Sequence, residues 1–253
     1  MGKLEIEMKF INNIVKKFKK KLTVGLYNDQ PREQWVINKI KELPNGYKLL
    51  DAGAGELKYK KYCGHLNYIS QDFAQYDGKG DGVGLQIGTW DNSKLDIISD
   101  ITNIPRENNS FDAIMCTDVF EHLPNPIKAV QEFSRLIKKG GKLIITAPFC
   151  SLTHFAPYHF CTGFNKYFFE HHLSENDFDI IEISYNGNFF EYIAQELKRT
   201  RSVAEEYCSY KLNKKESKQI KNVLKILQNL TEKDTKSYEL LNHGLFIYAE
   251  KRN

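Results

Sequence analysis

Leu49-Leu50-Asp51-Ala52-Gly53-Ala54-Gly55 is the stretch that decides the expected fold. The leucines belong to a short β-rich run that begins at Lys48, and the glycines follow directly after the acidic residue. Glycine lets the backbone turn sharply and lets a ligand approach without meeting a Cβ atom. The stretch therefore predicts a strand, a ligand-binding turn and the opening of a helix.

Beyond Tyr47, short β-rich runs alternate with helical segments, as a parallel sheet with crossover helices requires. One crossover helix is predicted from Pro126 to Ile137, with Gly140-Gly141 stopping it. The expected fold class is α/β. Predicted strands are Lys48-Asp51, Asn67-Asp72, Asp96-Ser99, Phe111-Cys116, Lys142-Ala147, Phe178-Tyr185 and Gly244-Glu250, and later helices are Phe189-Tyr210 and Lys215-Leu230.

The segment from Gln75 to Lys94 breaks this alternation. It holds Gly78, Gly80, Gly82, Gly84 and Gly88, which make a poor helix where a crossover would be expected. We predict a long shaped loop, inserted into a domain that covers residues 47–253 and includes carboxyl-terminal helices between residues 189 and 230.

Residues 1–46 are expected to form an amino-terminal helical cap. Apolar residues recur at helical spacing from Met8 to Leu22, and lysines fill much of the rest. The favoured interpretation is a cap packed on the domain; the alternative is a weak peripheral contact of 8–22 with a membrane surface or an acidic polymer. A second helix is predicted from about Pro31, with Trp35 and Ile40 facing inward.

Length and composition limit the class of protein. The chain has 253 residues, a formal charge of +4 and no apolar run near the roughly 20 residues that cross a bilayer. Its five cysteines form no CxxC pair, which argues against a disulfide framework and a thiolate zinc site. We expect a cytoplasmic protein that does not bind DNA.

Acidic residues at successive strand ends suggest a nucleoside ligand. Asp72 stands 21 positions after Asp51 and suits two ribose hydroxyls, while Asp100 and Ile101 suit an adenine amino group and ring. Lys58 stands where a dinucleotide site has its third glycine, so NAD is disfavoured. Asp51 suits a donor with an amino group and a sulfonium but no phosphate.

Three further stretches form a set of motifs with 50–55, Asp72 and 100–101, namely Ser110-Phe111-Asp112-Ala113-Ile114, 117–126 and Leu136 to Pro148. With these residues, the sequence between about Tyr47 and Tyr185 resembles the Rossmann-fold methyltransferases of the type 11 kind. The resemblance implies S-adenosyl-L-methionine as methyl donor, S-adenosyl-L-homocysteine as product, and a seven-stranded, mostly parallel sheet whose last strands are antiparallel. The implied donor-binding residues are Asp51, Gly53, Gly55, Asp72, Phe73, Asp100, Ile101 and Thr117. The residues at 71–73 and 88–91 look most like those of bacterial family members that act in surface-polysaccharide or glycoconjugate synthesis.

Two histidines follow the fifth predicted strand and are candidates for catalysis. Methyl transfer is an in-line displacement, so alignment in a dry site supplies most of the effect and a base only takes the acceptor's proton. His154 and His159 titrate in the right range for that base, although either could instead shape the pocket. O-methylation of a small-molecule or sugar acceptor is preferred, because no Pro-Pro-Tyr or Pro-Pro-Phe motif of N-methylation follows the fourth strand.

Asp118-Val119-Phe120-Glu121-His122 could place two carboxylates and an imidazole around a divalent ion. A similar ExxEH grouping occurs in ubiquinone-pathway and small-RNA methyltransferases, but many relatives carry the letters without metal, so we expect no metal here. His171-His172 is expected on a surface helix. Two alternatives stay open: a metal-assisted RNA 2′-O-methyltransferase using Asp118, Glu121 and His122, and a donor-binding regulatory protein without turnover.

Overall fold

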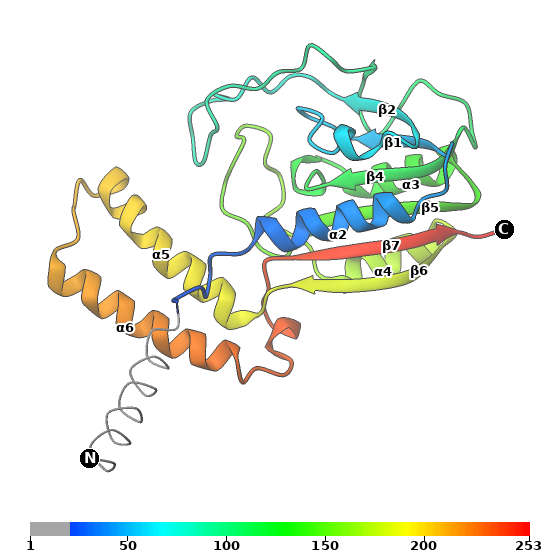
Figure 1. The fold of residues 1–253 in the computed structure, drawn as a ribbon. Helices are drawn as coiled ribbons and strands as arrows, with labels where there is room; N and C mark the ends of the chain where they lie inside the picture. The colour runs from blue at the N-terminus through cyan, green and yellow to red at the C-terminus, as the bar shows by residue number, and fades with distance from the viewer. Residues whose placement is uncertain (1–20) are drawn as a thin grey trace, which may run out of the picture.

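Seven strands form one sheet in the order β3-β2-β1-β4-β5-β7-β6 in the computed structural model, which describes residues 21–253 (Figure 1). Strands β1 to β5 pair in parallel, and β7 runs antiparallel to both β5 and β6. This confirms the expected fold class. The strands are β1 Lys48–Ala52, β2 Asn67–Asp72, β3 Ile97–Ile98, β4 Phe111–Thr117, β5 Ile137–Pro148, β6 Phe178–Asn186 and β7 Gly244–Lys251.

The helices cover both faces of the sheet. α2 lies on one face, while α3 and α4 lie on the other, and α5 and α6 form a hairpin that extends from the carboxyl-terminal strands (Figure 1). None of the described helices is long and apolar enough to cross a membrane. The helices are α2 Asp29–Glu42, α3 Pro126–Leu136, α4 Lys166–Glu175, α5 Phe189–Tyr207 and α6 Lys214–Thr231, with 3₁₀ turns η1 Lys60–Tyr62, η2 Phe120–His122 and η3 Ser237–Glu239. The helix expected over 8–22 lies outside the described residues, apart from its last two.

The core consists of apolar side chains packed on each face of the sheet. Val36 and Ile40 of α2 pack with Leu49 of β1 on one face. On the other face, Phe133 of α3 and Phe169 of α4 pack against the sheet, and both are fully buried. Burying one such side chain contributes about 1.5–3 kcal/mol, so these two layers hold the strand ends in fixed positions.

No α-helix follows the glycine turn, so the predicted helix opening there is wrong. After Gly55 the chain makes turns and then only the 3₁₀ turn η1. Leu57 has φ +61°, a left-handed conformation that a right-handed helix excludes. Tyr59 and Cys63 are buried in the α2-side core, which ties the short connection down without a helix.

Gly140-Gly141 do not stop the crossover helix, which is a second correction. α3 ends at Leu136, and Ile137 enters β5 directly. The two glycines lie inside β5, where its register with β4 shifts between Phe111 and Ala113. A Cβ atom on Gly141 would lie 2.8 Å from the carbonyl oxygen of Asp112, so this bulge needs a residue without a side chain.

Candidate functional site

The glycine turn after β1 is anchored on the end of β2. The amides of Gly53 and Ala54 donate to the carbonyl oxygen of Gln71 at 2.8 and 2.9 Å. The Gly55 amide donates to Oδ2 of Asp72 at 3.0 Å. A Cβ atom on Gly53, whose φ is +77°, would lie 2.4 Å from Cγ2 of Val119. The structure thus brings the glycine turn and the carboxylate of Asp72 together.

Asp51 and Asp72 are buried carboxylates at neighbouring strand ends, exposed by only 2% and 7%. Burial raises the pKa of Asp51 to about 7, and the nearby Asp72 adds to that increase while the Tyr68 hydroxyl, which donates to Asp51 Oδ2 at 2.6 Å, opposes it. Burial also raises the pKa of Asp72, against backbone hydrogen bonds such as that from Ala74 at 2.9 Å. Such a pair favours a cationic group and hydrogen-bond donors as ligands.

Asp100 lies in the turn after β3, adjoining Asp72, because Ser99 of the same turn donates its amide to the carbonyl oxygen of Asp72 at 3.1 Å. The Asp100 carboxylate is exposed and caps Thr102, with both hydrogen bonds at 2.8 Å. Ile101 differs, since it is 5% exposed and packs in the main core. The turn therefore offers a carboxylate, while its isoleucine is mostly covered by protein.

Two further candidates stand near the same edge. Phe73 directly follows Asp72 and meets the Tyr158 ring edge-on at 4.9 Å. Thr117 is the half-buried last residue of β4, paired with Thr146 of β5. Both therefore lie at the carboxyl ends of the strands, where ligands of open α/β sheets bind.

Aromatic side chains from two loops cover the glycine turn. A Cβ atom on Gly55 would lie 2.4 Å from Cζ2 of Trp90. Trp90 meets Tyr76 at 5.7 Å and Phe155 at 5.5 Å between ring centroids, and Tyr76 stacks on Phe155 at 4.6 Å. The sequence predicted a shaped loop at 75–94 but not this packing, for which the aromatic residues among its glycines are the available signal. Gly55 is consequently buried.

Three histidines gather beside this aromatic set. The His154 ring lies 4.6 Å from His122 and 4.9 Å from His159 between centroids, and Phe155 stacks on His122 at 5.2 Å. Burial lowers the pKa of His122 to about 3, with His154 adding to the effect. Burial likewise lowers the pKa values of His154 and His159. All three imidazoles are therefore neutral at pH 7.

Glu121 completes the cluster from the turn η2. Its Oε1 atom lies 3.8 Å from Nε2 of both His122 and His154. Burial raises the pKa of Glu121 to about 8, and the charge of Asp118 acts in the same direction. His171 and His172 stand apart from this cluster, on α4 beside Glu175.

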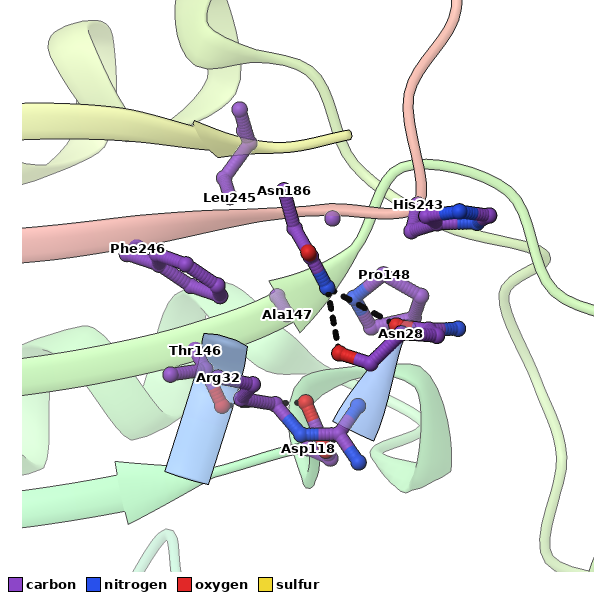
Figure 2. A pocket seen from close by; sticks show the side chains of 11 residues that line it. Asn28, Arg32, Asp118, Thr146, Ala147, Pro148, Asn186, His243, Leu245 and Phe246 are labelled. Carbon is purple, nitrogen blue, oxygen red and sulfur yellow. Dashed lines mark hydrogen bonds and ion pairs between the residues drawn. The ribbon is translucent and has the colours of Figure 1, made fainter. Parts of the chain in front are cut away.

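Asp118 is paired with Arg32, near the amino-terminal end of α2, and both line the same pocket (Figure 2). Arg32 Nη1 lies 2.8 Å from Asp118 Oδ2, and the Thr146 hydroxyl donates to Asp118 Oδ1 at 2.9 Å. Asn186 of β6 donates to the carbonyl and side-chain oxygens of Asn28 at 2.9 and 2.8 Å. Sequence reasoning missed Arg32, because nothing in the sequence pairs it with a residue 86 positions away.

Residues 50–145 match the protein-family model described as a methyltransferase domain. The chain is also 27% identical to a sarcosine/dimethylglycine N-methyltransferase of Aphanothece halophytica, over 50% of each chain. It is 30% identical to a ubiquinone biosynthesis O-methyltransferase of Xanthomonas oryzae pv. oryzae, over 25% of this chain and 26% of that one. The chain thus spans about half or less of the length of these curated relatives.

Among solved structures, a SAM-dependent methyltransferase from Archaeoglobus fulgidus has a similar fold, with a TM-score of 0.53 and 15% identity over 88% of this chain and 94% of that one. At that identity the likeness concerns the fold alone. The chain therefore matches a methyltransferase domain in sequence over residues 50–145, and its fold is that of a solved methyltransferase.

Proposed function

We propose that this chain is an S-adenosyl-L-methionine-dependent methyltransferase whose donor lies between the glycine turn and the ends of β2 and β3. The observation that carries the proposal is the pair of buried carboxylates Asp51 and Asp72 at neighbouring strand ends, of which Asp72 accepts the Gly55 amide of the glycine turn. In this assignment Asp51 faces the donor's amino group, Asp72 its ribose and Asp100 its adenine. The donor-contacting set is Asp51, Gly53, Gly55, Asp72, Phe73, Asp100, Ile101 and Thr117.

Donor entry then requires a movement of the aromatic cover. Trp90 lies against Gly55, where the methionine portion of the donor is assigned. Once the donor is bound, Trp90 and Phe155 would exclude water from the reacting methyl group, and a dry, aligned site is the main requirement of an in-line displacement. S-adenosyl-L-homocysteine would be the product.

The acceptor's proton would pass to His159. His154 commits Nδ1 to the carbonyl oxygen of Leu152 at 2.8 Å and turns Nε2 toward Glu121. His159 is less buried than His154, and its Nε2 atom contacts the Ser151 hydroxyl at 3.1 Å. Because Ser151 donates its own proton to the carbonyl oxygen of Thr162, His159 Nε2 is the donor in that contact and Nδ1 carries the lone pair of a base.

The proposed acceptor is an oxygen of a small molecule or a sugar of polysaccharide synthesis in the cytoplasm. The relatives include both an N- and an O-methyltransferase, so the preference for oxygen rests on the absence of the N-methylation motif after β4. A screen of nucleotide sugars and glycans for S-adenosyl-L-homocysteine formation tests the acceptor class. Turnover only on RNA, lost on chelation, would instead establish the RNA 2′-O-methyltransferase.

The first prediction concerns donor binding by the full chain. S-adenosyl-L-homocysteine at about 100 times its Kd should stabilise the native state by about 2.7 kcal/mol, which raises the melting temperature by about 5–11 °C in a domain of this size. NAD should leave the melting temperature unchanged, because Lys58 stands in place of the third glycine. Thermal melts with each ligand measure this, and no shift with either S-adenosyl compound would remove the proposal.

A second prediction concerns the pH dependence of binding. The buried Asp51, with a pKa of about 7, must lose its proton to pair with the ligand's ammonium group. Affinity for S-adenosyl-L-homocysteine should therefore rise by up to about tenfold per pH unit between pH 5.5 and 7, and level off above 7.

Isothermal titration at five pH values would measure that profile, with Asp51→Asn as the matched variant. The amide keeps the shape of the side chain but has no proton to lose, so its profile should be flatter. A wild-type affinity that is constant from pH 5.5 to 7.5 would contradict the assignment of Asp51 to the ammonium group.

A further inference from the structure

Three hydrogen-bond acceptors converge in the histidine cluster. His122 Nδ1 contacts the carbonyl oxygen of Tyr158 at 2.5 Å, and His154 Nδ1 contacts that of Leu152 at 2.8 Å. A carbonyl oxygen only accepts, so each neutral ring carries its proton on Nδ1 and a lone pair on Nε2. Both Nε2 atoms lie 3.8 Å from the same carboxylate oxygen, Oε1 of Glu121. Three lone-pair donors facing one another repel unless a proton or a metal cation lies between them.

The carboxylate of Glu121 supplies an independent observation. The residue is 2% exposed, and its Oε2 atom is buried without a hydrogen-bond partner in the described part of the chain. Buried carboxylates are normally paired, hydrogen-bonded or bound to metal. Asp118 does not complete the cluster, because Arg32 and Thr146 occupy its two carboxylate oxygens.

We propose that Glu121, His122 and His154 bind one divalent transition-metal ion, through the Glu121 carboxylate and both Nε2 atoms. These ligand atoms lie within 4.8 Å of one another. Bonds of about 2.0–2.2 Å place tetrahedral donors about 3.3–3.6 Å apart, so small side-chain movements would close the site. Each ring's Nδ1–H bond to a carbonyl is the outer contact that orients a metal-binding histidine.

The ligand set favours zinc or cobalt over magnesium, since two of the three donors are imidazoles. The set differs from the Asp118, Glu121 and His122 grouping weighed from the sequence, and it departs from the expectation of no metal. Three protein ligands leave a position for water or an acceptor oxygen. That last role rests on the proposed function, whereas metal binding itself does not.

The test uses the whole 253-residue chain without an affinity tag, stripped with a chelator. It is titrated with Zn²⁺ against a chromogenic competitor, and with Co²⁺ by visible absorption. We expect one ion per chain, a cobalt spectrum of a four-coordinate site, and a rise in melting temperature on metal addition. Glu121→Gln and His154→Ala should each weaken Zn²⁺ binding at least tenfold.

His171→Ala is the matched control, because His171, His172 and Glu175 form the other metal-capable cluster in the described residues, in which His171 and Glu175 are exposed on α4. It should leave Zn²⁺ binding unchanged. Loss of binding in His171→Ala but not in Glu121→Gln would overturn the proposal.

The competing explanation is that a proton, and not a metal ion, lies between the three acceptors. The variant Glu121→Gln distinguishes the proton from the metal. The amide group supplies a donor to the lone pairs, so the metal-free variant should fold at least as stably as the metal-free wild type and gain nothing from metal. The metal proposal would be overturned, in favour of a shared proton, if the wild-type chain bound neither Zn²⁺ nor Co²⁺ and melted at the same temperature with and without chelator. S-adenosyl-L-homocysteine binding, measured on the same samples, reports the proposed function separately.

Discussion

Asp72→Ala should weaken binding of S-adenosyl-L-homocysteine by between about 100-fold and about 10,000-fold. The buried carboxylate at the end of β2 is assigned both ribose hydroxyls, and each hydrogen bond to an ionised partner contributes about 1.5–3 kcal/mol. No water replaces the lost acceptor at low cost, since Asp72 is 7% exposed. Isothermal titration of wild type and variant at pH 8 measures the loss.

A control is required because Asp72 also accepts the Gly55 and Ala74 amides, so its removal could act by loosening the glycine turn. Asp96→Ala is matched to it: Asp96 likewise accepts two hydrogen bonds on β2, from the amide and hydroxyl of Ser70 at 2.8 and 2.7 Å. This control should lower thermal stability and leave ligand affinity within about twofold, a range typical of changes outside a site. Equal affinity losses in the two variants would place the ribose elsewhere.

The strands could be predicted because their residues obey local rules. β2 was predicted at its observed bounds, since a β-rich run separates a turn from a glycine-rich segment. The predicted β7 ends one residue before the observed strand. The connection after β1 could not be predicted, because the buried positions of Tyr59 and Cys63 depend on α2, which is distant in sequence. Tertiary packing overrides a local pattern in such short connections.

The candidate site divides in the same way. Asp51 and Asp72 were identifiable because each follows a strand at a fixed distance from the other, and parallel strand ends share one edge of the sheet. The cluster of Glu121 with His122 and His154 was not, since the sequence associated Glu121 with Asp118. Only the structure shows that Arg32 holds Asp118 and that the loop after β5 brings His154 to Glu121.

Phe120→Ala should lower the free energy of unfolding by about 3–5 kcal/mol, the range for truncating a fully buried aromatic side chain. Phe120 has no exposed surface, and its ring lies 5.4 Å from Phe169 and 5.9 Å from Phe164 between centroids. It is the first residue of η2, whose next two residues are Glu121 and His122. The resulting cavity should also weaken Zn²⁺ binding, because Phe120 is the fully buried residue that directly precedes Glu121 and His122 in η2. Urea unfolding followed by circular dichroism gives the stability change.

Phe160→Ala is the matched control for that substitution. Phe160 is 51% exposed, and its amide donates to the carbonyl oxygen of Glu121 in η2 at 2.9 Å. Truncating it removes little buried surface and keeps the amide, so the loss should stay near about 0.5 kcal/mol. Phe120→Leu, which refills most of the volume, should fall between the two. If Phe120→Ala unfolds at the same urea concentration as wild type, η2 is held by its backbone contacts, and the aromatic core does not position Glu121 and His122.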